Sequence, residues 1–227
     1  MNFELIKTIS HDINAYTQGY FFKDGFLYES TGLYGKSSLR KISTEDGSII
    51  KNINIEKKYF SEGIEYYKNN IYMLTWREQV CKVFDFNNFQ EIKNFQYSGE
   101  GWGISLFKSK FYMSNGSNTI KVLDPENFNT LEEFNVFDEN KNPIKWLNEL
   151  QVVDNFLLAN IWFTDKIVVI DIENKKFIKT IDFSSLRVYL KNKNAEVMNG
   201  IAYDEKEKIF YITGKFWDLS FKTKIYF

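Results

Sequence analysis

The sequence predicts an all-β fold: a five-bladed β-propeller with four antiparallel strands per blade, whose N-terminal strand closes the last blade. Three observations support this prediction. The chain holds five repeats of one layout, each repeat holds short apolar runs separated by turn residues, and the run that the last repeat lacks stands at the other end of the chain. A closed ring of repeats leaves no long open sheet edge, so this combination favours a propeller.

Two columns of residues define the repeat. The first-column residues are Gln18, Glu62, Trp102, Asn148 and Asn199, and the next residue is glycine in every repeat except the fourth, where it is Glu149. The second column opens the following apolar run with Tyr28, Tyr72, Tyr112, Leu158 and Tyr211. Within a repeat the two columns lie ten residues apart, or twelve in the fifth repeat, whereas the distance between repeats varies. This spacing is typical of repeat architectures.

The second repeat shows the four strands most clearly. They are expected at residues 62–67, 71–76, 79–85 and 91–97, with asparagines in the tight connections. The third strands of repeats one, three and four are expected at 38–42, 119–124 and 166–171, and their fourth strands at 49–55, 131–136 and 177–183. No segment predicts a full helix, although residues 184–194 are compatible with one short helical turn.

The fifth repeat holds three runs, at residues 199–203, 209–213 and 223–227. Its missing fourth strand has a counterpart near the start of the chain, because the tetrapeptide Ile-Lys-Thr-Ile at 6–9 recurs at 178–181, in the fourth strand of repeat four. We therefore expect the N-terminal strand to complete the last blade.

Composition is consistent with a single domain over residues 1–227. The aromatic content of 18% suits strands, where aromatic side chains pack well. The net charge of −1 excludes a nucleic-acid binder, which needs surplus Lys and Arg to replace phosphate counterions. No run approaches the ~20 apolar residues of a membrane span. We expect a monomer that binds neither nucleic acid nor membrane.

The chain has one cysteine, Cys81, and one histidine, His11. Cys81 cannot form an intrachain disulfide, and we interpret it as a small apolar residue in a strand. Zinc sites draw on several His and Cys residues, so no zinc site is expected. Residues 1–9 lack the apolar core of a signal peptide.

Candidate functional residues gather at one mouth of the predicted channel. The first column begins the strands that line the axis, and a third column ends the second strands at the same mouth: Gly32, Trp76, Gly116, Trp162 and Lys215. Aromatic walls around a few polar groups are typical of a small-ligand pocket. Glu62 is the leading candidate, because aromatic surroundings raise the pKa of a carboxyl while Lys215 lowers it, which suits proton transfer near neutral pH.

A structural explanation of the same columns stays open. A polar axis can simply bind ordered water, and a tryptophan in a strand is often only packing. The ligand pocket is favoured because Trp76, Trp102 and Trp162 fall in the two rim columns, whereas Trp146 and Trp217 fall elsewhere.

Ten short motifs resemble a known family, the plant-type glutaminyl-peptide cyclotransferases, also called glutamine cyclotransferases. They are YTQG (16–19), YESTGLYGKSS (28–38), FSEGI (60–64), LTW (74–76), GWG (101–103), SNGS (114–117), LNEL (147–150), ANIW (159–162), MNGIA (198–202) and TGK (213–215). The departures are mild. The family more often has Phe where this chain has Tyr16, and a Trp-Pro pair after the TGK lysine where this chain has Trp217-Asp218.

The resemblance implies a five-bladed propeller that converts N-terminal glutaminyl residues of peptides to 5-oxoproline with release of ammonia. It implies no metal or other cofactor, and a secreted, periplasmic or lumenal location that the missing signal segment leaves open. We assign Glu62 as the proton shuttle and Asn148, Gln18 and Lys215 as candidates to bind carbonyl oxygens. The apolar walls that exclude water are expected to be Trp76, Trp102, Trp162, Phe60 and Tyr16.

Two other classes remain as alternatives. A metal-dependent lactonase-like propeller could ligate a divalent cation through Glu62, Asn148 and Asn199, although that class usually has six blades. A non-catalytic scaffold of the WD-repeat kind would carry a Trp-Asp pair in each blade, and this chain has only Trp217-Asp218.

Overall fold

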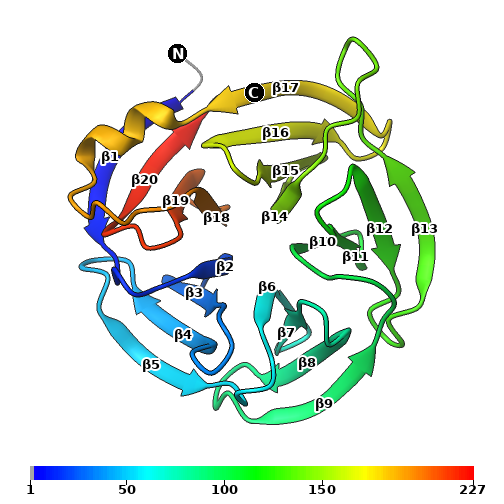
Figure 1. Ribbon diagram of the computed structural model, residues 1–227, viewed down its shortest axis with the longest axis horizontal. Coiled ribbons are helices and arrows are strands. Elements are labelled where there is room, and N and C mark those ends of the chain that lie inside the picture. The colour runs from blue at the N-terminus through cyan, green and yellow to red at the C-terminus, as the bar shows by residue number, and fades with distance from the viewer. Residues whose placement is uncertain (1–2) are drawn as a thin grey trace.

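A computed structural model describes residues 3–227, and these residues form a ring of five four-stranded antiparallel sheets (Figure 1). The first blade holds β2 (Thr17–Lys23), β3 (Phe26–Thr31), β4 (Ser38–Ser43) and β5 (Ile49–Asn54). The second holds β6 (Ser61–Tyr67), β7 (Asn70–Thr75), β8 (Val80–Asp85) and β9 (Glu91–Gln96). The third holds β10 (Ile104–Phe107), β11 (Lys110–Met113), β12 (Thr119–Leu123) and β13 (Thr130–Asn135).

The fourth blade holds β14 (Leu147–Val153), β15 (Phe156–Ile161), β16 (Lys166–Asp171) and β17 (Lys176–Asp182). The fifth is ordered β1-β20-β19-β18, from β1 (Phe3–Ser10) at the rim through β20 (Leu219–Ile225) and β19 (Ile209–Gly214) to β18 (Met198–Asp204) at the axis. A 3₁₀ helix, η1 (Ser184–Tyr189), occupies the connection where one short turn was predicted. Within residues 3–227, no helix has the length and apolarity that a membrane crossing requires.

The predicted fold is confirmed, including its closure. Strand β1 pairs with β20 in antiparallel register from Phe3 opposite Ile225 to Ser10 opposite Leu219, so the N-terminal strand completes the last blade. Most strand ends lie within two residues of the prediction. The start of β20 is the exception: it was predicted at residue 223 and lies at Leu219, because this segment gains partners on both sides, from β19 and from β1.

The hydrophobic core is divided among the five interfaces between neighbouring blades. Each interface holds its own cluster of buried side chains; for example, Tyr72 of the second blade packs on Phe111 of the third with ring centroids 4.7 Å apart. Aromatic pairs of this kind supply large buried area. Many of the aromatic side chains therefore pack between blades. This packing holds the inner strands in a fixed ring around the axis.

Glycine after the first-column residue allows the inner strands to approach closely. A Cβ atom placed on Gly103 would lie 2.2 Å from the carbonyl oxygen of Asn148 in the next blade, which no real contact permits. Glu149 breaks this pattern in the fourth blade. It is fully buried, one of its carboxyl oxygens accepts a hydrogen bond from the Tyr20 backbone N–H at 2.8 Å, and its other oxygen has no partner among the described residues.

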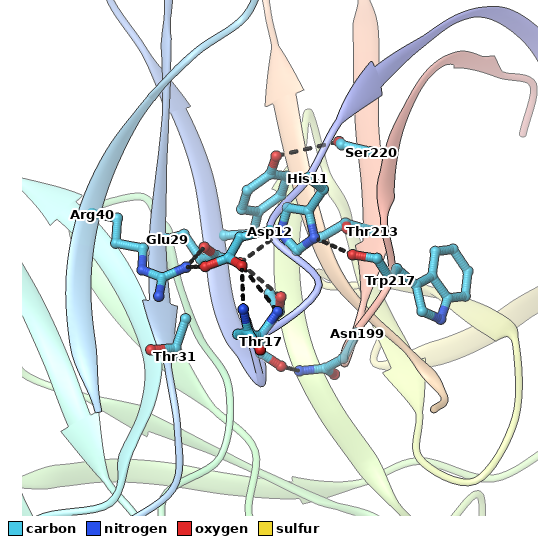
Figure 2. A network of polar contacts seen from close by, with 12 residues as sticks. His11, Asp12, Thr17, Glu29, Thr31, Arg40, Asn199, Thr213, Trp217 and Ser220 are labelled. Carbon is cyan, nitrogen blue, oxygen red and sulfur yellow. Dashed lines mark hydrogen bonds and ion pairs between the residues drawn. The ribbon is translucent and has the colours of Figure 1, made fainter. Parts of the chain in front are cut away.

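A buried polar network joins the first and last blades where the ring closes (Figure 2). His11 follows β1, and its Nε2 lies 2.8 Å from Oε1 of Glu29 on β3, while its Nδ1 lies 2.8 Å from the carbonyl oxygen of Trp217. Thr17 donates to the same Glu29 oxygen at 2.7 Å, and Arg40 lies 3.4 Å from the other. The network therefore ties the connection before β2 to the connection before β20.

Candidate active site

A pocket of about 200 Å³ opens at one mouth of the central channel, and it brings together all nine residues that were predicted as site residues. Its lining is Tyr16, Gln18, Phe60, Glu62, Trp76, Trp102, Asn148, Trp162 and Lys215. They meet because inner strands begin, and the antiparallel second strands end, at the same edge of each blade. Asn199 does not line the pocket. Its Nδ2 donates to the Thr17 and Gln18 carbonyl oxygens at 3.0 and 3.2 Å and so braces the neighbouring inner strand.

Glu62 lies at the start of β6 and is 3% exposed. Burial raises the pKa of its carboxyl well above the usual 4.5, and the charge of Lys215 only partly opposes this. Its Oε2 has no hydrogen-bond partner among the described residues. A carboxyl with one free oxygen and a raised pKa can hold a proton at neutral pH and pass it to a bound group.

Lys215 follows β19 and is 2% exposed. Burial lowers the pKa of its ammonium to about 8, while Glu62 and Glu196 act in the opposite direction. The Nζ atom lies 4.4 Å from the ring centroid of Tyr16 and 5.7 Å from that of Trp162, distances at which an aromatic face attracts a cation. The pocket therefore holds a carboxyl group and an amine, and burial disfavours the charged form of each.

Asn148, at the start of β14, supplies a neutral amide beside these two groups. It is 2% exposed, and its Oδ1 has no partner among the described residues. Its backbone is held by Ser114, whose hydroxyl donates to the Asn148 carbonyl oxygen at 2.6 Å. With its backbone fixed, the amide can offer both a donor and an acceptor to a ligand.

The aromatic walls are held by contacts to one another and to one acid that the sequence analysis missed. Glu100 accepts hydrogen bonds at its Oε2 from the indole N–H groups of Trp76 and Trp102, at 2.7 and 3.0 Å. The sequence signal for Glu100 was weak, because it stands outside the repeated columns and only its place two residues before Trp102 points to the pocket. Trp102 also lies directly over Gly116, where an added Cβ would come within 2.6 Å of the indole ring.

No cluster of three or more His, Cys, Asp or Glu residues in the described part of the chain could hold a metal ion. The trio of oxygen ligands considered for a lactonase-like site does not meet in the pocket, since Asn199 lies outside the lining.

Comparison with known proteins identifies the family of the chain. A sequence profile described as glutamine cyclotransferase matches residues 1–225. The chain belongs to the glutamine cyclotransferase family. A glutaminyl-peptide cyclotransferase of Arabidopsis thaliana is 30% identical over 227 residues, covering 98% of this chain and 71% of the plant protein.

Solved structures agree with this family. A crystal structure of Myxococcus xanthus glutaminyl cyclase superposes on this chain with a TM-score of 0.90 and 28% identity, covering 98% of this chain and 96% of the other. The WD40 domain of Neurospora crassa Pan2, with 8% identity and a TM-score of 0.57, shares the propeller architecture alone. Family and fold together support glutaminyl cyclase activity.

Proposed function

We propose that this protein converts N-terminal glutaminyl residues of peptides to 5-oxoproline, releases ammonia, and needs no metal ion to do so. The observation that carries the proposal is the free Oε2 of Glu62, buried beside Lys215 and Asn148 in a pocket with indole walls. At about 200 Å³ the pocket is below the roughly 300–1,000 Å³ of sites for drug-sized ligands. This size suits the single terminal residue of a peptide whose remainder stays outside.

The reaction transfers one proton between two nitrogen atoms of the same residue. The α-amine nitrogen attacks the side-chain amide carbon, a C–N bond forms, and the amide oxygen becomes negative. The bond from that carbon to the amide nitrogen then breaks, and the nitrogen leaves as ammonia with the proton that the α-amine gave up. Ring closure is intramolecular, so holding the folded conformer supplies much of the rate.

In this proposal Glu62 carries that proton, first as a base and then as an acid. In the empty pocket burial favours its neutral form. When a substrate binds as an ammonium ion, its positive charge favours the carboxylate, and the carboxyl proton leaves to solvent. The carboxylate then accepts a proton from the ammonium, which gives the neutral amine that attacks. Lys215, Asn148 and Gln18 are the donors available to the developing oxyanion. The tryptophan walls exclude water that would otherwise hydrolyse the amide.

Ammonia release from a glutaminyl dipeptide, with and without a chelator, tests the proposal. We expect equal release in both conditions, and none from the same dipeptide with an acetylated α-amine, because the blocked nitrogen cannot attack. Absence of ammonia from the free dipeptide would refute the activity. Loss of ammonia release on chelation, restored by added metal, would refute the metal-independent mechanism and revive a metal-assisted one.

A further inference from the structure

Two large aromatic side chains lie exposed beside the pocket. Trp146 is 45% exposed and Phe163 is 62% exposed, and both contact Trp162, which lines the pocket. The Phe163 ring stacks on Trp162 with centroids 3.8 Å apart, and Trp146 meets Trp162 and Phe163 edge to face, at 5.6 Å in each case. We call these three residues the aromatic platform. It continues the inner wall of the pocket onto the outer surface without a break.

The backbone under the platform is held in a conformation that bulky residues rarely adopt. The φ angles of Trp146 and Phe163 are +66° and +67°. Within the described residues, they are the only exposed large hydrophobic residues with positive φ. Phe89 and Phe128 share the conformation, but they are buried in the core, where packing compensates for it. The rings of Trp146 and Phe163 contact each other and Trp162 but stay exposed, so bulky side chains are kept at positive φ without burial in the core, which points to a function.

Hydrogen bonds keep the platform rigid. The Trp146 N–H donates to the Gly116 carbonyl oxygen at 2.9 Å, and the Trp162 N–H donates to the Trp146 carbonyl oxygen at 2.8 Å. After Phe163, the Thr164 N–H and hydroxyl both donate to the Ile161 carbonyl oxygen, at 3.1 and 2.7 Å. Rigid aromatic surfaces of this kind bind side chains at low cost in conformational entropy.

Beside Phe60 and Trp76, which also line the pocket, the exposed ring of Tyr34 lies among charged groups. There the Tyr34 hydroxyl donates to Glu78 at 2.7 Å, and Arg77 pairs with Glu100 at 3.3 Å. A peptide whose first residue fills the pocket has its second Cα about 3.8 Å further along the chain, at the mouth. An apolar side chain at that second position would desolvate charged groups if it lay beside Tyr34 and would gain contact with aromatic rings if it lay on the platform.

We propose that the aromatic platform is a subsite for the second residue of the substrate peptide and selects aromatic and large aliphatic side chains there. This inference rests on the proposed function, since it is the glutaminyl residue in the pocket that places the second residue at the mouth. Through Trp146 and Phe163, which lie outside the lining, the platform adds to the pocket a preference at the second position.

The test compares dipeptide amides that differ only at the second position. We expect the native protein to turn over Gln-Phe and Gln-Trp amides with a kcat/KM about three- to tenfold above that of Gln-Gly amide. The variants Trp146→Asn and Phe163→Asn remove a ring without opposing the backbone, because Asn tolerates positive φ. Both should reduce the aromatic preference and leave Gln-Gly turnover unchanged. Phe137→Asn, at a residue 45% exposed and outside the pocket lining, is the matched control and should change neither rate.

Several outcomes would overturn the inference. An aromatic preference that survives both substitutions would remove the platform from substrate binding. An equal loss on Gln-Gly and Gln-Phe would show that the platform only supports the pocket. Sedimentation that shows a native dimer split by Trp146→Asn, with the preference intact, would make the platform a contact between two copies. Failure of the native protein on every glutaminyl dipeptide would instead refute the proposed function itself, and the inference with it.

Discussion

Glu62 and Lys215 illustrate how burial alone creates reactive groups from ordinary side chains. Both are almost completely excluded from water, so the pKa of the carboxyl rises and the pKa of the ammonium falls. Their mutual attraction opposes both shifts but does not cancel them. Burial thus shifts the pKa of Glu62 upward and the pKa of Lys215 down to about 8, the directions that favour proton transfer at neutral pH.

Substitution Glu62→Gln tests the proton shuttle. Glutamine keeps the shape of the side chain but cannot carry a proton, so we expect turnover of a glutaminyl dipeptide to fall by ~10²–10⁴. The variant should unfold at the same denaturant concentration as the native protein or a higher one, since a buried ionisable group has been replaced by a neutral one. Near-normal turnover in a folded Glu62→Gln variant would remove Glu62 from the mechanism.

The charge of Lys215 predicts the alkaline limb of the pH profile. Its pKa lies near 8, so the ammonium is lost as the pH rises through that value, and kcat/KM should fall there if the cation stabilises the oxyanion. Titration of the substrate α-amine acts with the opposite sign, because its reactive neutral form grows with pH. In Lys215→Arg, which stays charged, the alkaline limb should disappear, and in Lys215→Ala turnover should fall at every pH. An unchanged alkaline limb in Lys215→Arg would assign the titration to another group.

The pocket could be located from the sequence because the repeat spacing places equivalent residues at equivalent depths. Residues without repeated counterparts were not found. Glu100 lies between columns, and Trp146 was set aside because it falls outside them. His11 was considered only in arguing that the chain has too few ligands for a zinc site. Its contact with Trp217 spans a sequence separation of 206 residues, which no local pattern reveals. Periodicity thus predicted the common framework, and individual contacts between distant segments required the structure.

Among the structural elements, the connection between β1 and β2 carries a buried histidine, His11, that pairs with a buried carboxylate. Both ring nitrogens of His11 face acceptors, a carbonyl oxygen and the Glu29 carboxylate, so the imidazolium satisfies both. Burial alone would lower the pKa of His11, but the charge and hydrogen bond of Glu29 outweigh it and raise the pKa above 6.5. Burial would raise the pKa of Glu29, and His11 with Arg40 and Thr17 lowers it instead. Asp12, 3.0 Å from Arg40, completes the charges around this pair.

This ion pair predicts how stability depends on pH. Folding raises the pKa of His11, so its contribution is complete below pH 6.5 and is lost as the pH rises through the raised value. Folding lowers the pKa of Glu29, so its contribution is complete above pH 4.5 and is lost as the pH falls through the lowered value. We expect His11→Gln to cost about 3–5 kcal/mol of unfolding free energy near pH 6, and less in alkaline solution, as measured by urea titration.

A comparison with a surface pair separates this effect from ordinary charge removal. Lys68 and Glu126 lie 2.7 Å apart, but both side chains are more than 60% exposed. Lys68→Gln should therefore change stability little at any pH. A His11→Gln variant with the same pH dependence of unfolding as the native protein would show that His11 is not charged in the folded state.

At the scale of the whole molecule, side-chain clusters between blades hold the ring together, and the pairing of β1 with β20 closes it. No single blade has a complete core, because every cluster draws on two neighbours. The pairing of β1 with β20 places Phe3 beside Ile225, so the first and last strands of the described residues are neighbours at the rim of the last blade. The sequence predicted this closure from one repeated tetrapeptide, whereas the β-bulge between Leu5 and Lys7 could only be seen in the structure.

Circular permutation tests the closure. A short Gly-Ser linker joining the two present ends, with new ends between Asn140 and Lys141 in an exposed turn, keeps every strand pair. We expect the permutant to retain activity and to refold faster, because β1 and β20 become a local hairpin. Removing residues 1–10 instead should leave the edge of β20 open and cause aggregation, seen by light scattering. Soluble, active protein after that deletion would show that the pairing of β1 with β20 is dispensable.

The pairing of β1 with β20 also has a consequence for folding during synthesis. Strand β1 leaves the ribosome before the rest of the ring, yet its partner β20 is made after all other strands. The pocket draws Tyr16 and Gln18 from the first blade and Lys215 from the last. A nascent chain therefore lacks the complete pocket until the fifth blade docks beside the first.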